Sequence, residues 1–183
     1  MIAHDLGGGL TLTPLEPADA TEFAAFIDAE RAHLDPWLPW VAAIHDAESA
    51  HPFLQRYADG AATDSRYLFA LRVDGLMVGG ALFRVFDVDA GLCEVGVWLA
   101  AGAQGHGYIG RAATAMLDWA LLERGLHRAE WRCVPENTGS RAVAERLGLR
   151  HDGTLREAWR FRDRWWDLEV WAVLADEWRT LRS

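Results

Sequence analysis

A glycine-rich stretch in the middle of the chain has residue types and spacing that suit anion binding. Its residues are Gln104, Gly105, His106, Gly107, Tyr108, Ile109, Gly110 and Arg111. A β-rich run, residues 94–99, precedes it, and a helical pattern follows it over about 108–123. A strand that leads through a glycine loop into a helix directs unpaired N–H groups and the positive helix end at one point. The stretch therefore predicts a site for a phosphate or pyrophosphate.

The same glycines allow a second interpretation. Gly105, Gly107 and Gly110 have the G-x-G-x-x-G spacing of dinucleotide-binding folds, and Glu130 follows about twenty residues after the loop. Tight turns rather than helices connect the preceding strands, however, and Glu130 falls inside a predicted strand. A single crossover follows the loop, whereas a doubly wound sheet needs more. These features disfavour a dinucleotide site, and the chain has no P-loop motif.

The elements that must position this loop can be predicted along the chain. The strands are expected at residues 10–15, 66–73, 76–86, 92–99, 128–134, 149–161 and 165–174. The helices are expected at residues 16–34, 47–59, 108–123 and 139–147. Asp74-Gly75 is a typical hairpin turn. This order predicts an α/β (α+β) fold with a mixed, mostly antiparallel sheet of about seven strands, four helices and a central β-α-β crossover.

Composition limits the class of protein. A chain of 183 residues that is 51% apolar suits one domain, residues 1–183, with a sizeable core. No apolar run approaches the ~20 residues of a membrane span, and residues 1–9 lack a secretory signal pattern. Cys93 and Cys133 are too few for a disulfide framework, so we expect a cytoplasmic protein without a membrane partner. The net charge of −9 disfavours nucleic acid as a partner.

Three segments in order resemble one protein family. The glycine loop with its preceding strand is similar to the acyl-CoA loop of the GNAT N-acetyltransferase superfamily. Residues 136–149, ENTGSRAVAERLGL, resemble its second cofactor segment, E-N-x-x-S-x-x-V-x-E-[KR]-x-G-[FL]. Residues 155–158, LREA, and 33–40, HLDPWLPW, resemble the RimJ/RimL branch, which acetylates protein N-termini and, in relatives, other amines. The resemblance covers about residues 10–174 and implies a single GNAT domain with its fold.

The resemblance implies acetyl-CoA as the donor and assigns the residues that bind it. The strand before the loop is expected to splay from the next strand, so that pantetheine pairs with its edge. The implied cofactor-binding residues are Val97, Trp98, Leu99, Gln104, Gly105, His106, Gly107, Tyr108, Ile109, Gly110, Arg111, Asn137 and Ser140. Two loop residues depart from the family pattern. The family usually has Gly or Ala at the position of Ile109, and often Lys or Arg at the position of His106. Backbone amides are therefore expected to carry more of the phosphate binding.

Catalysis in such an enzyme needs a base for the amine and an acid for the leaving thiolate. Glu94 and Glu157 are both predicted as the base, and Ser140 as the acid. The alternative for each glutamate is an ion pair with an arginine, for which Arg132 and Arg156 are the obvious partners. The alternative for Ser140 is helix capping, as it is for Asn137. A covalent role for Cys133 is disfavoured because no activating histidine lies nearby.

The acceptor side is predicted from aromatic and acidic residues. Trp37, Trp40, Glu94 and Glu157 are expected to line the acceptor cleft, with core packing as the alternative for the tryptophans. The turn at residues 162–164 borders this cleft or a homodimer contact. The histidines lack metal-ligand spacing, so no metal is expected.

The predicted function is therefore acetyl transfer from acetyl-CoA to a primary amine, either a protein or peptide N-terminus or a small molecule. A non-catalytic acyl-CoA sensor or scaffold of the same fold is one alternative. A succinyl-CoA-using relative is the other, with Arg84 or Arg160 holding the second carboxylate.

Overall fold

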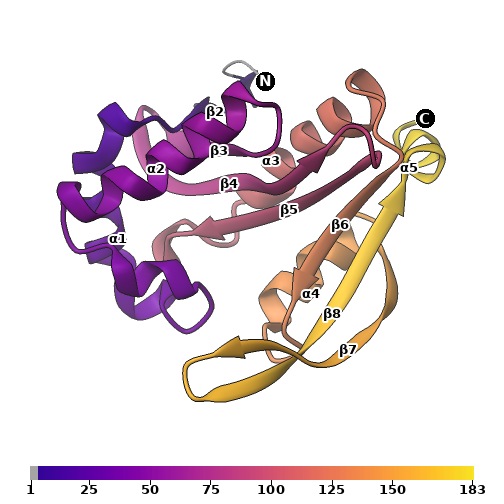
Figure 1. The fold of residues 1–183 in the computed structure, drawn as a ribbon. Coiled ribbons are helices and arrows are strands. Elements are labelled where there is room, and N and C mark those ends of the chain that lie inside the picture. The colour runs from indigo at the N-terminus through magenta and orange to yellow at the C-terminus, as the bar shows by residue number, and fades with distance from the viewer. Residues whose placement is uncertain (1–3) are drawn as a thin grey trace.

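The computed structural model describes residues 4–183 and contains one eight-stranded sheet (Figure 1). Its strand order is β1-β2-β3-β4-β5-β6-β8-β7. Within the described residues β5 and β6 are the parallel pair, and the other neighbours are antiparallel. A sheet with one parallel pair is not a doubly wound dinucleotide fold, and Glu130 lies inside β6. The predicted mixed, mostly antiparallel sheet is confirmed.

The elements follow the predicted order closely. The strands are β1 (His4–Asp5), β2 (Leu10–Pro14), β3 (Tyr67–Val73), β4 (Leu76–Asp87), β5 (Leu92–Leu99), β6 (Arg128–Cys133), β7 (Arg150–Phe161) and β8 (Arg164–Leu174). The α-helices are α1 (Ala20–Leu34), α2 (Ala47–Ala62), α3 (Tyr108–Leu117), α4 (Thr138–Arg146) and α5 (Ala175–Arg182). Short 3-10 turns occupy η1 (Pro17–Asp19), η2 (Pro39–Ala43) and η3 (Ala101–Ala103).

Helices cover both faces of the sheet, and each face has its own core. Alternate side chains of a strand point to opposite faces, so β5 contributes to both cores. Cys93 and Val95 pack in the core under α3, whereas Trp98 packs in the core under α1 and α2. Figure 1 shows α1 and α2 on one face and α3 on the other. On β5, odd-numbered side chains therefore point to the face covered by α3, and even-numbered side chains point to the face covered by α1 and α2.

The central helix is shorter than predicted. α3 ends at Leu117, and the chain continues to Glu123 as a wider π-helix, η4 (Asp118–Glu123). In this turn the N–H of Arg124 donates to the carbonyl of Trp119, five residues earlier, at 2.8 Å. Arg124 also stacks over the Trp119 ring and forms an ion pair with Asp64. Apolar periodicity alone does not distinguish a π-turn from an α-turn.

Two terminal elements were not predicted. β1 has two residues and extends the sheet beyond β2. α5 contains one buried side chain, Trp178, whose indole N–H donates to Asp118 Oδ1 at 2.8 Å. A helix that packs through a single tryptophan lacks the repeated apolar positions by which helices are predicted.

Gly80 on β4 supplies a stability prediction, because the Trp98 ring lies directly over it. A Cβ at Gly80 would lie 2.0 Å from Cζ2 of Trp98. Gly80→Ala is therefore expected to displace this ring and to lower the free energy of unfolding by about 1–3 kcal/mol, measured by urea denaturation. Gly102→Ala is the matched control, since nothing lies within 4 Å of its Cβ position. Equal urea midpoints for the two variants would contradict the prediction.

Candidate active site

The parallel strands β5 and β6 begin side by side and then separate. Their Cα partners run from Leu92–Arg128 to Val95–Trp131 and end there, although β5 continues to Leu99. The predicted splay is thus confirmed, and within the described residues the β5 edge that faces β6 over residues 96–99 has no strand partner. Val97, Trp98 and Leu99 lie on this stretch. An extended ligand can add to such an edge through backbone hydrogen bonds.

The glycine loop follows the free edge and presents a row of backbone donors. Among the described residues, the N–H groups of Gly105, His106 and Gly107 have no hydrogen-bond partner. The next N–H groups belong to the first turn of α3, whose ladder begins with Arg111 N–H donating to Gly107 C=O at 3.1 Å. Gly105 and Gly107 have φ angles of 83° and 72°, which favour glycine. Open space lies at the Cβ positions of Gly105, Gly107 and Gly110, so the loop fits a diphosphate.

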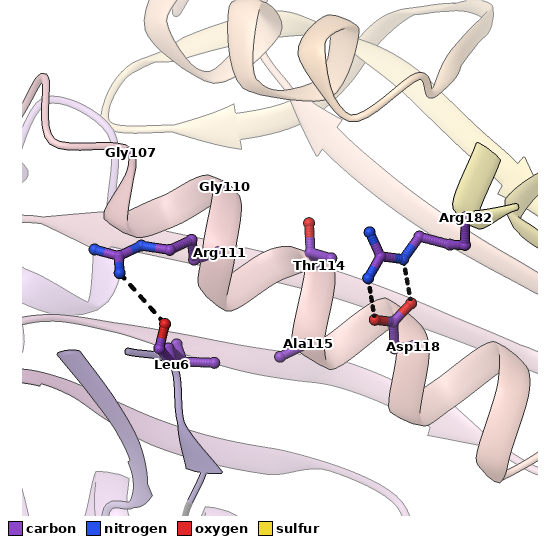
Figure 2. Close-up of a pocket in the computed structure, with 8 residues that line it drawn as sticks. All are labelled: Leu6, Gly107, Gly110, Arg111, Thr114, Ala115, Asp118 and Arg182. Atoms are coloured by element: carbon purple, nitrogen blue, oxygen red, sulfur yellow. Dashed lines mark hydrogen bonds and ion pairs between the residues drawn. The ribbon is translucent and has the colours of Figure 1, made fainter. Parts of the chain in front are cut away.

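The side chains of the loop lie beside these donors. His106 stacks on Tyr108 with ring centroids 5.2 Å apart, and the Arg111 guanidinium lies over Tyr108 at 5.4 Å. Arg111 Nη1 also donates to the carbonyl of Gly7 at 2.8 Å. Figure 2 shows Arg111 pointing toward the β1–β2 turn from a shallow groove along α3. Ile109 is half-buried and packs against the core under α3. Its departure from the family pattern therefore adds an anchor to the core.

The end of α1 holds the start of the loop through two contacts that the sequence did not indicate. Glu30 Oε2 accepts a hydrogen bond from the Ala101 N–H at 2.9 Å. The Gln104 amide nitrogen lies 3.1 Å from His33 Nε2. Glu30 and His33 are three apart and so share one face of α1. That spacing alone is typical of any solvent-exposed helix face, so these contacts could not be predicted.

Ser140 lies at the N-terminus of α4, beside the open end of the V formed by β5 and β6. Its hydroxyl accepts a hydrogen bond from Trp131 Nε1 at 2.8 Å. The helix cap is Asn137, whose Oδ1 accepts from the Ser140 N–H at 3.1 Å. The Ser140 hydroxyl therefore does not cap the helix, and its own hydrogen stays available for donation. Asn137 does cap the helix and keeps only its NH₂ group for a ligand.

Glu94 lies at the closed end of the V and is ion-paired. Arg84 Nε donates to Glu94 Oε1 at 2.6 Å, and Arg84 Nη2 donates to Oε2. Arg132 Nε lies 3.6 Å from the same Oε2. Arg84 is the extra residue of a bulge in β4 between Phe83 and Val85, and it has no Cα partner on β5. Both Glu94 oxygens are therefore engaged, and Arg84 is the partner that the sequence did not indicate.

Glu157 is exposed and lies at an irregularity of β7. Its φ is 48°, which is unusual for a glutamate, and the register with β8 shifts between Leu155 and Trp159. The Glu157 N–H donates to Asp167 Oδ1 at 2.8 Å, which holds this bulge. Among residues 4–183 the Glu157 carboxylate has no ion-pair partner. Of the two predicted bases, Glu157 thus has the free carboxylate, and it lines a surface pocket with Leu155, Arg156 and Asp167.

Cys133 is buried at the end of β6 near Ser140. Burial raises the pKa of its thiol to about 11, against a smaller lowering by the Ser140 hydroxyl. Burial likewise raises the pKa of the Cys93 thiol to about 12. A thiol with so high a pKa is protonated at neutral pH and is a poor nucleophile.

Cys133→Ala is therefore expected to keep steady-state turnover within about twofold of the wild type, because no covalent acetyl-enzyme forms. In the native protein, iodoacetamide labelling should stay slow at pH 8 and accelerate as the pH rises toward 11, with mass spectrometry as the readout. Denatured protein, in which both thiols are accessible, is the control. An acetylated Cys133 trapped after mixing with acetyl-CoA would contradict the expectation.

The residues predicted to line the acceptor cleft lie in the segment from the end of α1 to η2 and on the β7–β8 hairpin. Trp40 packs edge-on against Trp98 at 5.3 Å and stacks on Phe53 at 4.9 Å, so it belongs largely to the core. Trp37 is half-buried. At the tip of the hairpin, Arg162 forms an ion pair with Asp35 at the end of α1. The hairpin tip therefore contacts the segment that carries Trp37 and Trp40 (Figure 1).

Comparison of the sequence with protein-family profiles identifies the family of this chain. The profile of the family described as "Acetyltransferase (GNAT) domain" matches residues 9–150, which is more than half of the chain. The chain belongs to the GNAT acetyltransferase family. As a GNAT enzyme it transfers an acetyl group from acetyl-CoA to an amine, and the resemblance of the three sequence segments is confirmed.

Individual relatives resemble this GNAT acetyltransferase over different lengths. The putative ribosomal N-acetyltransferase YdaF of Bacillus subtilis is 27% identical over 174 residues, covering 92% of this chain and 93% of YdaF. Phosphinothricin N-acetyltransferase of Streptomyces coelicolor is 41% identical over 86 residues, covering 47% of this chain and 50% of that protein. The structure of Mycobacterium smegmatis RimJ in complex with CoA-disulfide is 28% identical in sequence and has a TM-score of 0.84. The match covers 92% of this chain and 83% of the RimJ chain.

The described part of the GNAT domain contains neither a metal-binding cluster nor a membrane-spanning helix. Over residues 4–183, no three His, Cys, Asp or Glu side chains are grouped so that they could hold a metal ion. In the same part of the chain, every helix is too short or too polar to cross a bilayer.

Proposed function

We propose that this GNAT acetyltransferase acetylates the N-terminal α-amine of a protein or peptide. The amine nitrogen forms a bond to the acetyl carbon, the carbon–sulfur bond breaks, and coenzyme A leaves as the free thiol while the amine loses a proton. One observation carries the acetyl-CoA part of the proposal: a free strand edge and a loop of unpaired N–H groups lie together at the open end of the V. The resemblance to YdaF over nearly the whole chain supports a protein acceptor.

Residues of the chain are given roles by their contacts. Acetyl-CoA supplies the activated acetyl group. The free N–H groups of the 105–107 loop bind its diphosphate, and the β5 edge orients its extended arm. Glu157, with a free carboxylate, takes the proton of the acceptor ammonium. The Ser140 hydroxyl, held by the Trp131 indole at 2.8 Å, donates a hydrogen bond to the departing thiolate.

Acceptor profiling with detection of released thiol and product mass tests the proposal. The panel contains peptides with free N-termini, the same peptides with blocked N-termini and an internal lysine, and small amines. Thiol release with free but not blocked peptides is expected. No release above background with any amine, although CoA binds in calorimetry, would instead favour the non-catalytic sensor.

Ser140→Ala separates chemistry from binding. We expect about a 100-fold lower kcat, because the acid is lost, with an unchanged dissociation constant for CoA. Weaker CoA binding with the same kcat would reassign Ser140 to binding alone.

A small-molecule acceptor is the second candidate, and the 41% identity to phosphinothricin N-acetyltransferase over 86 residues favours it. Turnover of small amines with inert peptides would establish it in place of a protein acceptor. The cytoplasmic location and a homodimer remain predictions from the sequence.

A further inference from the structure

A chain of alternating charges crosses the sheet where β5 and β6 separate. Its members are linked by ion pairs in the order Asp152, Arg128, Glu130, Arg132, Glu94 and Arg84. Glu94 is an even-numbered β5 residue, as Trp98 is, and therefore faces the side of α1 and α2. Glu130 and Arg132 share this face because Glu94 pairs with Glu130. The charges thus lie on the face opposite α3, at the closed end of the V.

The two arginines at this point retain unused donors. Arg84 uses Nε and Nη2 to hold Glu94, and Arg132 uses Nε and Nη2 to hold Glu130. Within residues 4–183 the Nη1 group of each has no acceptor. The Arg84 side chain is 55% exposed and that of Arg132 is 31% exposed. Two guanidinium groups therefore flank Glu94 with N–H groups directed to solvent or to a ligand.

Stability alone does not explain the arrangement, because Glu94 and Glu130 are only 13% and 10% exposed, and the desolvation of nearly buried charges offsets much of their attraction. Glu94 instead fixes Arg84 in place, and its hydrogen bond raises the pKa of Arg84, which stays charged. The six groups carry three positive and three negative charges, so the network is neutral. A cationic amine that entered alone would leave an unbalanced charge beside it, whereas an amine with a neighbouring anion would not.

We propose that Arg84 and Arg132 bind an anionic group that the acceptor carries close to its amine. This inference rests on the proposed acetyl transfer and names the class of acceptor. A guanidinium binds a carboxylate through charge-assisted hydrogen bonds, which are stronger than neutral ones. The anion can be an acidic side chain near the N-terminus of a peptide or the α-carboxylate of a free amino acid.

Matched acceptors test the inference on the full chain with acetyl-CoA. Ser-Asp-Gly-amide is compared with Ser-Asn-Gly-amide, and serine with serinamide, by kcat/KM from thiol release. We expect at least about a tenfold preference for the anionic member of one pair. The peptide pair reports an acidic side chain, and the serine pair reports a free carboxylate, so the two sources are distinguished.

Variants assign the preference to the arginines. Arg84→Met keeps the apolar stem and should reduce the preference to about twofold or less, and Arg84→Lys should restore part of it. Arg150→Met is the control. Arg150 forms an ion pair with Glu177 at 2.8 Å and lies away from the V, so this variant should keep the full preference. Thermal unfolding confirms that each variant is folded.

Other outcomes overturn the inference. These are equal kcat/KM within both pairs, a preference that survives Arg84→Met in folded protein, or a selective gain with succinyl-CoA, which would place the anion on the donor. Each still leaves acetyl transfer intact. Absence of thiol release with every amine would instead remove the proposed function itself.

Discussion

Glu157→Gln is expected to lower kcat by at least about 100-fold, because the amide cannot accept the proton of the acceptor ammonium. The affinity for CoA should not change, since Glu157 lies on β7 and not on the β5 edge or the glycine loop. The left-handed backbone at φ 48° accommodates Gln as well as Glu, so the fold is preserved. Steady-state kinetics with the best acceptor, together with calorimetry for CoA, measure both quantities.

Two further variants make this result specific. Glu94→Gln should reduce turnover less, because Glu94 is already engaged by Arg84 and positions that arginine. Glu123→Gln, an exposed change after α3, should have no effect. If Glu94→Gln instead abolished turnover while Glu157→Gln remained active, Glu94 would be the base.

Gly107→Val is expected to weaken CoA binding by more than tenfold. A β-branched residue is strained at the φ of 72° found there, at a cost of about 1–2 kcal/mol or more. The added side chain would also enter the open space before the free N–H groups of the loop. Relief of the strain would turn these N–H groups away from the diphosphate. Isothermal calorimetry with CoA and with dephospho-CoA measures the loss.

Gly102→Val is the matched control for this experiment. Gly102 lies in η3, its backbone is outside the left-handed region, and its Cβ position is also open. It should bind CoA like the wild type. Equal affinities for the two variants would show that the loop conformation does not determine binding.

Local patterns explain why most of the fold could be predicted. Asp74 and Gly75 have φ angles of 49° and 85°, the turn that their residue types favour between β3 and β4. Ala112, Met116 and Ala120 form one apolar face and are all fully buried. The glycine loop could be predicted because left-handed positions select glycine. Short terminal elements such as β1 and α5, which pack through few side chains, leave no such periodic pattern.

The partners of the site residues could not be predicted, because they depend on departures from regular geometry. Arg84 is the residue that a bulge in β4 leaves without a Cα partner, so its position beside Glu94 does not follow from a regular strand register. Glu157 lies in a bulge of β7 that Asp167 holds. Neither bulge contains a glycine or proline that would indicate it in the sequence. Both glutamates could therefore be predicted as candidate bases, but not which of them keeps a free carboxylate.

The C-terminal end of α1 contacts both of the proposed substrate regions. Glu30 and His33 hold the entry to the donor loop, and two residues later Asp35 holds the tip of the hairpin that carries Glu157. Movement of this helix end therefore shifts both regions together. By thermodynamic linkage, if bound CoA raises the affinity for the acceptor by some factor, bound acceptor must raise the affinity for CoA by the same factor. The measurable consequence is an acceptor dissociation constant that depends on the concentration of CoA, and a CoA dissociation constant that depends equally on the concentration of the acceptor.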